Sequence, residues 1–371
     1  MNELEMSRKE ISRIDTEMAR LFEQRMKVCG DIAEYKRKCG LSVRDTAREA
    51  ELIERNCGLI ENADVESYYV QFMRKTIDLS CAYQSKLLKG MRVTYCGVEG
   101  AFAYMAAKRM FPEAELVPFA DFADAYQAVE RGEFDCAVLP LENSAAGEVG
   151  TVMDLLFSGS LYINQVLDLP IVHNLMANEG ASLDGIKTVV SHPQALDQCG
   201  EYIRQHGFET LPYSNTALAA KHVKETGDPG LAAIASDDTS TLFGLKVLDK
   251  SINDVKNNTT RFAAFSRAQN RPSSPKKRED ENFILVFTVR NEAGSLAQTL
   301  NIIGAHGFNM RSLRSRPMKE LQWNYFFYIE AEGNIYNENG QDMLRELGAV
   351  CAKLRLVGTY YSNLKTEERN K

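Results

Sequence analysis

Two short stretches of the chain combine hydroxyl, amide and charged side chains that could do chemistry. The first is NNTTRF, residues 257–262, where Thr259 and Thr260 lead into Arg261. A hydroxyl hydrogen-bonded to a departing oxygen can assist its loss, and an arginine can hold a carboxylate. Three strand-like runs end in similar polar clusters: PLENS (140–144), SHPQ (191–194) and AIAS (233–236). Because ligands in open α/β sheets bind beyond the carboxyl ends of strands, we expect these stretches to line one cleft.

Each cluster also has a structural explanation. Glu142, Asn143 and Ser144 could cap a following helix, and Ser191 could cap a helix that starts near Pro193. Each of these alternatives is about as probable as a ligand site. GVEGAF, residues 97–102, resembles an anion-binding loop but lacks both common nucleotide motifs, so we do not expect a nucleotide.

The second stretch is the first helical segment of the chain, where an arginine lies in a row of apolar residues. An apolar seam steps by three and four residues through Ile11, Ile14, Met18, Leu21, Val28, Ile32 and Tyr35. Arg25 lies in this seam, where a charge is costly unless it is paired. Arg25 therefore needs an anion, which could be an internal carboxylate or a ligand.

Other polar residues of this region could complete a pocket. They are Arg8 and Lys36 on the same helical segment as Arg25, then Asp45, Arg48 and Glu49 within one turn, and Ser80 and Gln84 four residues apart. This set suits a dicarboxylate that carries a hydroxyl. Arg8 and Arg25 are 17 residues apart, which is about 25 Å along a helix. If both bind one molecule, Arg8 must come from another chain, which predicts a dimer.

The elements that must position these residues fall into three zones. Residues 3–88 contain no proline and have a helical pattern throughout. From Met91 to about Arg267, short β-rich runs alternate with helical ones, which predicts an α/β domain with a largely parallel sheet. The segment 269–281 is polar and proline-bearing, as in a linker. Beyond it the predicted order is βαββαβ, which is ferredoxin-like.

Composition narrows the class of protein. A chain of 371 residues with 44% hydrophobic residues is long enough for two or three domains. The formal net charge of −7 argues against nucleic-acid binding, and no apolar run is long enough to span a bilayer. The eight cysteines include no C-x-x-C pair, and no histidines have metal-ligand spacing, so we expect reduced thiols and no metal. These features predict a cytoplasmic protein.

The helical zone resembles the bacterial chorismate mutase family in RKEISRIDTEMARLFEQR, in Lys36 and in VRDTARE. The resemblance implies an all-α domain over residues 1–89 that rearranges chorismate to prephenate. By the same resemblance, Lys36 and Gln84 donate to the ether oxygen, and Arg8 and Arg25 bind the substrate carboxylates. The remaining substrate contacts fall on Asp45, Arg48, Glu49 and Ser80. The reaction moves no proton, so positioning and stabilisation of charge suffice.

The middle zone resembles prephenate dehydratases in YCGVEGAFAYMAA, AVLPLENSAAGEVG, SHPQALDQC, LAAIAS, LFGL and NNTTRF, in that order. The resemblance implies a two-lobed α/β domain, like a periplasmic binding protein, over residues 90–268. It assigns catalytic roles to Asn143, Ser191, Gln198 and Thr260 and a substrate contact to Glu142. Arg261 would bind a substrate carboxylate, although a structural role is nearly as plausible.

The last zone, residues 282–366, resembles an α+β ferredoxin-like ACT regulatory domain in NEAGSLAQTL. The resemblance places a small effector, phenylalanine in dehydratases, against Gly294, Ser295 and Leu296. A second family motif normally reads Glu-Ser-Arg-Pro, but this chain has Arg314-Ser315-Arg316-Pro317. The change makes phenylalanine sensitivity doubtful, and the domain could instead only dimerise.

Taken together, the resemblances imply a bifunctional, cofactor-independent enzyme of phenylalanine biosynthesis. Two alternatives remain: an enzyme that retains one of the two activities, and a non-catalytic metabolite sensor. A sensor requires an output module, and the mixed charges of the N-terminal helices are unlike a DNA-reading face.

Overall fold

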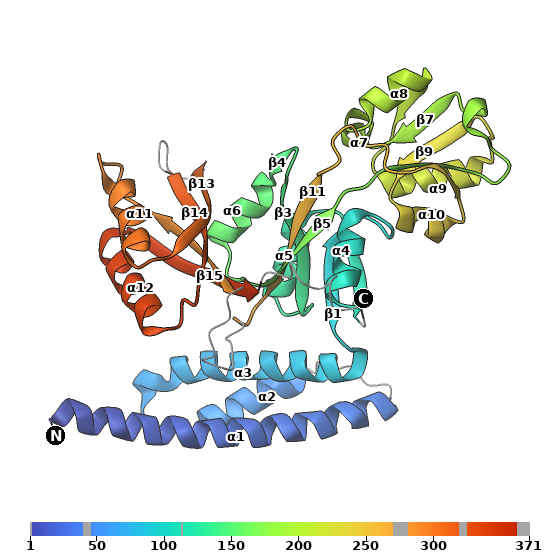
Figure 1. The fold of residues 1–371 in the computed structure, drawn as a ribbon. Helices are drawn as coiled ribbons and strands as arrows, with labels where there is room; N and C mark the ends of the chain where they lie inside the picture. The colour runs from blue at the N-terminus through green and yellow to red at the C-terminus, as the bar shows by residue number, and fades with distance from the viewer. Residues whose placement is uncertain (1, 40–45, 113, 270–280, 319–324, 362–371) are drawn as a thin grey trace, which may run out of the picture. The chain divides into compact units, whose positions relative to one another are not determined.

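The computed structural model describes residues 2–39, 46–112, 114–269, 281–318 and 325–361 (Figure 1). The chain divides into two compact units. The first comprises Met1–Arg92 with Glu113–Glu115, and the second comprises Val93–Pro112 with Leu116–Lys371.

The first unit is built from helices, as the sequence predicted: α1 (Glu3–Cys39), α2 (Thr46–Cys57) and α3 (Ala63–Lys89). Asn62 caps α3, because its side chain accepts a hydrogen bond from the Asp64 N–H. α3 packs against both α1 and α2. Its buried residues recur every three or four positions, at Met73, Thr76, Ile77, Ser80 and Gln84, so a polar row lies inside the bundle.

The apolar seam of α1 faces away from α3. Ile11 is 58% exposed and Leu21 is 55% exposed, whereas Cys29 and Ala33 are buried. In the described part of the chain, no apolar surface therefore covers most of the length of this seam. Exposed apolar rows of this kind usually belong to an interface.

The second unit begins with a two-lobed α/β region. The first lobe contains β1 (Arg92–Cys96), β2 (Glu115–Phe119), β3 (Cys136–Asn143), β4 (Gly147–Glu148), β5 (Tyr162–Pro170) and β11 (Thr259–Ser266), with α4 (Phe102–Met110), α5 (Phe122–Glu130) and α6 (Gly150–Ser158). The second lobe contains β6 (Asn174–Ala177), β7 (Thr188–Ser191), β8 (Glu209–Pro212), β9 (Leu231–Ala235) and β10 (Lys246–Asp249). Its helices are α7 (Pro193–Asp197), α8 (Gly200–His206), α9 (Thr216–Thr226) and α10 (Asp237–Phe243). The chain enters the second lobe after β5 and returns through β11 (Figure 1), which confirms the two-lobed arrangement.

The expectation of a largely parallel sheet was wrong for this region. β3 is parallel to β1, but β11 runs antiparallel to both β3 and β5. In the second lobe β7 is parallel to β8 and β9, while β6 is antiparallel to β9 and β10. Both sheets are mixed because the strands next to the crossings return in the opposite direction, which strand propensity alone does not reveal.

The third region has the predicted order βαββαβ: β12 (Glu281–Thr288), α11 (Ser295–Ala305), β13 (Asn309–Pro317), β14 (Tyr325–Glu332), α12 (Glu338–Val350) and β15 (Lys353–Tyr361). Its four strands pair in the order β13-β14-β12-β15. The predicted linker, 269–281, lies almost wholly outside the described residues.

One pairing joins this sheet to the first lobe. Gly358 of β15 lies opposite Ile163 of β5, in parallel register. A Cβ atom at Gly358 would overlap the Ile163 carbonyl. Glycine therefore permits the two strands to approach, and a ten-stranded sheet runs through both regions.

The described helices include none that is both long and apolar enough to cross a membrane.

Candidate functional site

In the helical unit, the structure brings Arg25 together with the polar row of α3. The Arg25 guanidinium donates hydrogen bonds to the Ser80 hydroxyl and, at 3.5 Å, to the Thr76 carbonyl. Ser80 in turn donates to the Thr76 carbonyl at 2.7 Å. Gln84 lies one turn further along α3, 6% exposed. Its Oε1 atom is buried and has no hydrogen-bond partner in the described part of the chain.

The partners of Arg25 bear on the choice between an internal carboxylate and a ligand. Within the described residues, the Arg25 guanidinium contacts a hydroxyl and a carbonyl, both neutral. No carboxylate pairs with it among residues 2–39, 46–112 and the other described ranges. A half-buried guanidinium that meets only neutral groups favours a ligand anion.

The other predicted residues of this site are more dispersed. Arg8 and Arg48 are exposed, and Glu49 accepts a weak hydrogen bond from the Cys81 thiol, with 3.7 Å between Sγ and Oε1. Asp45 and the Lys36 side chain lie outside the described residues. Arg8 and Arg25 lie on one continuous helix, α1, so within a chain their separation follows the helical rise.

A cavity of about 560 Å³ lies against α2 and α3. It shares Glu49 with the predicted site and is otherwise lined by Ala50, Ile53, Glu54, Val70, Arg74, Ile77 and Asp78. Arg25, Ser80 and Gln84 do not line it, so the cavity and the polar row are neighbouring features of the bundle.

In the two-lobed region, strand register brings Asn143 and Thr260 together. Thr260 of β11 lies opposite Asn143 of β3. The Asn143 Nδ2 atom donates to the Thr260 hydroxyl at 2.9 Å and to the Asn258 Oδ1 atom at 2.8 Å. The Asn143 Oδ1 atom accepts from two backbone N–H groups, so a turn follows β3 here. The alternative that Asn143 caps α6 was wrong, because the N-cap of that helix is Val149.

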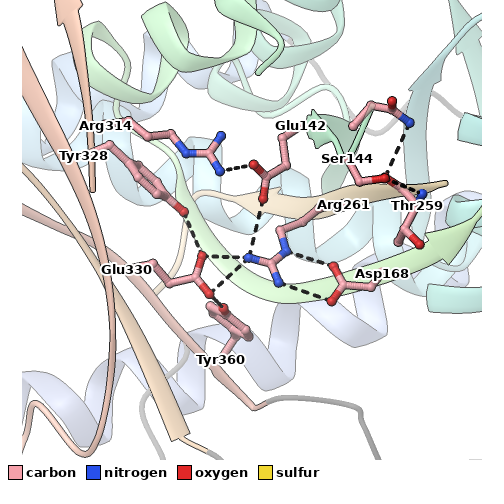
Figure 2. Close-up of polar contacts among 10 residues, drawn as sticks. Glu142, Ser144, Asp168, Thr259, Arg261, Arg314, Tyr328, Glu330 and Tyr360 are labelled. Atoms are coloured by element: carbon pink, nitrogen blue, oxygen red, sulfur yellow. Dashed lines mark hydrogen bonds and ion pairs between the residues drawn. The ribbon is translucent and has the colours of Figure 1, made fainter. Parts of the chain in front are cut away.

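Glu142 and Arg261 lie opposite each other one position along the same strands. Because successive side chains alternate between faces, these two lie on the other side of the sheet from Asn143 and Thr260. The Arg261 guanidinium donates to both carboxylate oxygens of Asp168, at 2.8 and 3.2 Å, and to Glu330 at 2.9 Å (Figure 2). Glu142 pairs with Arg314 and lies 3.7 Å from Arg261.

Glu330, on β14, is the buried centre of this network. It is 1% exposed and accepts hydrogen bonds from Tyr328, at 3.3 Å, and from Tyr360 (Figure 2). Burial, and then the charge of Glu330, raise the pKa of both tyrosines. Burial opposes the charge of Arg261, but Asp168 and Glu330 outweigh it and raise the pKa of this arginine. In this structure Arg261 is held by acids of the protein, which favours its structural role.

The second lobe holds the two remaining predicted residues. Ser191 is fully buried at the end of β7 and donates to the Ile234 carbonyl at 2.6 Å. The alternative that it caps α7 was wrong, because the His192 side chain does so. The Gln198 Oε1 atom accepts a hydrogen bond from His173 Nε2 at 3.0 Å. Burial lowers the pKa of His173, a residue that is 2% exposed, and its hydrogen bond holds the Gln198 amide in one orientation.

The predicted effector residues lie at two places in the third region. Gly294 precedes α11 with φ +87°, and Ser295 and Leu296 form the first turn of that helix. Arg314 and Ser315 lie on β13, an edge strand of the sheet. Arg314 forms an ion pair with Glu142. Arg316, two residues further along β13, pairs with Glu148 at 2.8 Å and Asp154 at 3.0 Å. The arginine that replaces the expected glutamate therefore joins the third region to β3.

Comparison with known proteins matches this division of the chain. Residues 7–85 match chorismate mutase type II, and residues 93–270 match prephenate dehydratase. The bifunctional chorismate mutase/prephenate dehydratase of Buchnera aphidicola subsp. Acyrthosiphon pisum is 30% identical, covering 97% of each chain. The chain belongs to the bifunctional chorismate mutase/prephenate dehydratase family.

Two further relatives of this family member each match about three quarters of the chain. Arogenate dehydratase/prephenate dehydratase 1, chloroplastic, of Arabidopsis thaliana is 33% identical over 74% of this chain and 73% of its own. The crystal structure of prephenate dehydratase from Arthrobacter aurescens in complex with L-Phe has a TM-score of 0.67 and 28% identity. It covers 73% of this chain and 90% of that one.

Sequence reasoning on this bifunctional chain missed several site residues. Asn258 was inside the quoted NNTTRF stretch, and its spacing of two from Thr260 could have placed both on one face. Thr76 precedes Ser80 by one helical turn, and this spacing could have placed both residues on one face of the helix. His173 and Glu330 carry no such signal, because their partners are distant in sequence.

Proposed function

We propose that this chain catalyses two consecutive reactions. The helical unit rearranges chorismate to prephenate, and the two-lobed region converts prephenate to phenylpyruvate, carbon dioxide and water. The observation that carries the second assignment is the cluster of Asn143, Thr260 and Asn258. The cluster combines hydroxyl and amide donors at the end of a strand, where an α/β sheet binds its ligand.

For the mutase reaction, Arg25 supplies the cation that holds a substrate carboxylate. The breaking ether oxygen gains negative charge, and Lys36 and Gln84 are our candidates for the groups that donate to it. No proton is transferred in this unimolecular step, so cations and an amide are sufficient. Asp45, Arg48, Glu49 and Ser80 complete the substrate contacts in this proposal.

The mutase site is shared between two chains in this proposal. The exposed seam of α1 offers an apolar face for a second copy, with Met18 at 45% and Val28 at 54% exposure. Antiparallel pairing of two such helices would bring Arg8 of one chain toward Arg25 of the other. A homodimer therefore both covers the seam and completes the site.

For the dehydratase reaction, the bond from the ring to its carboxylate breaks and its electron pair enters the ring. The ring becomes aromatic as the C4 hydroxyl leaves, and one proton converts that hydroxyl to water. Thr260 accepts a hydrogen bond from Asn143, so its own hydroxyl hydrogen is free to point to the leaving oxygen. Ser191 and Gln198 position the substrate from the second lobe.

The third region is our candidate for an ACT regulatory domain. Its βαββαβ order fits that assignment, and the relative from Arthrobacter aurescens was crystallised with L-Phe. An amino acid bound at Gly294, Ser295 and Leu296 could act on β3 through Arg314 and Glu142. Phenylpyruvate formation should then change when phenylalanine, tyrosine or methionine is added, and no change with any of them would leave the region a dimerisation or structural domain.

The dehydratase assignment is tested by supplying prephenate to the purified chain and measuring phenylpyruvate. Arogenate, which carries an amino group in place of the side-chain keto group and would yield phenylalanine, should be tried in parallel with phenylalanine measured, because a plant relative is an arogenate dehydratase/prephenate dehydratase. Phenylpyruvate from prephenate supports the proposal. Conversion of arogenate alone would show that arogenate, and not prephenate, is the substrate. If neither compound is converted, the proposed dehydratase function is rejected.

A further inference from the structure

The hydrogen bonds of Asn143 fix the orientation of its amide without ambiguity. Its Oδ1 atom accepts from the N–H groups of Ala145, at 3.0 Å, and Ala146, at 2.9 Å. A backbone N–H can only donate, so the atom that faces both must be the oxygen. The Nδ2 atom of Asn143 therefore points the other way, toward Asn258 and Thr260.

The same amide has no donor left for a substrate. One Nδ2 hydrogen serves Asn258 Oδ1 at 2.8 Å and the other serves the Thr260 hydroxyl at 2.9 Å. The Asn143 Nδ2 atom also lies 3.4 Å from the Thr259 carbonyl oxygen, which is a longer contact than the other two. An amide nitrogen has two hydrogens, so both are used within the protein.

The orientation of Asn258 follows from that of Asn143. Because Asn143 presents a donor, Asn258 must present its Oδ1 atom in return, and its Nδ2 atom turns away. Asn258 is 3% exposed, and this Nδ2 atom is buried with no hydrogen-bond partner among the described residues. Its backbone carbonyl accepts from the Ile171 N–H at 2.8 Å, which anchors it beside the crossing between the lobes. A buried donor without a partner is uncommon in folded proteins and calls for an explanation.

We propose that Asn258 is a substrate-contacting residue of the dehydratase site, and that Asn143 is a positioning residue that orients both Asn258 and Thr260. This inference rests on the proposed dehydratase function. In it, the Asn258 Nδ2 atom donates to an oxygen of prephenate beside the oxygen that meets the Thr260 hydroxyl. The unused donor is thereby satisfied only when substrate is bound.

The substitution Asn258→Asp separates the two roles, because it preserves shape. An aspartate keeps an acceptor oxygen toward Asn143 but replaces the free amide donor with a second oxygen. Prephenate is an anion, so this oxygen would repel it as well as fail to donate. We expect kcat/KM for prephenate to fall by about 100-fold at neutral pH, as for the loss of a buried donor to a developing charge.

The pH dependence of this variant gives a signature that a structural role would not produce. A carboxyl group buried beside an anionic substrate has a raised pKa, and its protonated form regains an O–H donor. The ratio of variant to wild-type kcat/KM should therefore rise as the pH is lowered, after the uncatalysed conversion of prephenate is subtracted. Asn257→Asp, which places the same charge on an exposed neighbour, is the matched control and should stay within about threefold of wild type.

The outcomes are distinct. If wild type forms phenylpyruvate and folded Asn258→Asp stays within about threefold of it, with a ratio that does not change with pH, the inference is overturned. If Asn258→Asp does not fold by circular dichroism, Asn258→Ala, which adds no charge, is used instead. We expect it to lose at least about 30-fold in kcat/KM, and near-wild-type activity would overturn the inference. If wild type itself forms no phenylpyruvate, the proposed function fails instead.

Discussion

Thr260 and Arg261 are adjacent on β11 but belong to different sets of contacts. Thr260 meets Asn143 on one face of the sheet, whereas Arg261 meets Asp168 and Glu330 on the other. The residue proposed for chemistry therefore lies on the opposite face of the sheet from the residue that ties the sheet to the third region. Thr259, two positions before Arg261, uses its backbone N–H to bind the Ser144 hydroxyl at 2.9 Å (Figure 2).

This difference predicts unequal effects of two matched substitutions. Thr260→Val replaces the hydroxyl by a methyl group and should lower phenylpyruvate formation by about 100-fold or more, because the leaving oxygen loses its donor. Chorismate consumption should stay at the wild-type level. Thr259→Val, the control, should have much less effect. The reverse order of the two variants would show that the wrong hydroxyl has been chosen.

At this scale the sequence predicted Thr260, Asn143 and Arg25 as candidate site residues, because each lies in a sequence motif or breaks an apolar pattern. It could not assign their partners. The surroundings of Arg261 depend on Glu330, which lies 69 positions away in the chain. Strand pairing decides such contacts, and neither periodicity nor propensity specifies it.

At the scale of elements, β15 and β5 meet at a single close pair. Gly358 lies against the Ile163 carbonyl, and the space between them excludes even a methyl group. The ion pairs of Arg261, Arg314 and Arg316 lie across the same junction between the third region and the first lobe. This junction links the candidate regulatory region to the strand that bears Asn143.

Gly358→Ala should weaken this junction. The added Cβ must push the strands apart, and overpacking of this kind costs about 1–3 kcal/mol. We expect a lower thermal midpoint for the second unit, measured by calorimetry, together with weaker coupling of any effector to phenylpyruvate formation.

Gly304→Ala provides the control for that substitution. Gly304 lies within α11, and a Cβ there would meet no atom within 4 Å. Alanine is the better helix former, so this variant should be neutral or slightly more stable. Equal thermal midpoints for Gly358→Ala and wild type would contradict the close contact between β15 and β5.

The order of elements could be predicted well, and their pairing could not. The helical zone and the βαββαβ order follow from apolar periodicity and turn residues, and both are confirmed. The direction of β11 was not predicted because the whole second lobe lies in the sequence between β5 and β11. Such a pairing joins residues about 90 positions apart, such as Arg261 and Asp168.

At the scale of the whole molecule, the proposed mutase site requires two chains. The seam of α1 is exposed in one chain, and Arg8 lies on the same helix as Arg25. A second chain would bury the seam and supply the missing arginine. Closed pairs of this kind are the most common symmetric assemblies.

A shared site can be tested by complementation between two inactive variants. Arg8→Ala and Lys36→Ala should each lose most mutase activity in a pure homodimer. In a randomly assorted mixture, half of the dimers contain one copy of each variant, and one of their two sites carries neither substitution. Activity should therefore recover to about a quarter of the wild-type value.

The control for this experiment is a mixture of the two pure homodimers in which the subunits have not exchanged. The mutase activity of this mixture should remain lost. Recovery would require that Arg8 and Lys36 of one site come from different chains. Mixed dimers without recovered activity would contradict the shared site. Phenylpyruvate formation from prephenate should be unchanged in both variants.

The most direct test of the central claim is to supply chorismate to the purified chain, with no added cofactor, and to follow the products over time. The account predicts that chorismate disappears and that phenylpyruvate accumulates, with prephenate as the intermediate. Accumulation of prephenate alone would contradict the second activity, and unchanged chorismate would contradict the first and favour a non-catalytic sensor.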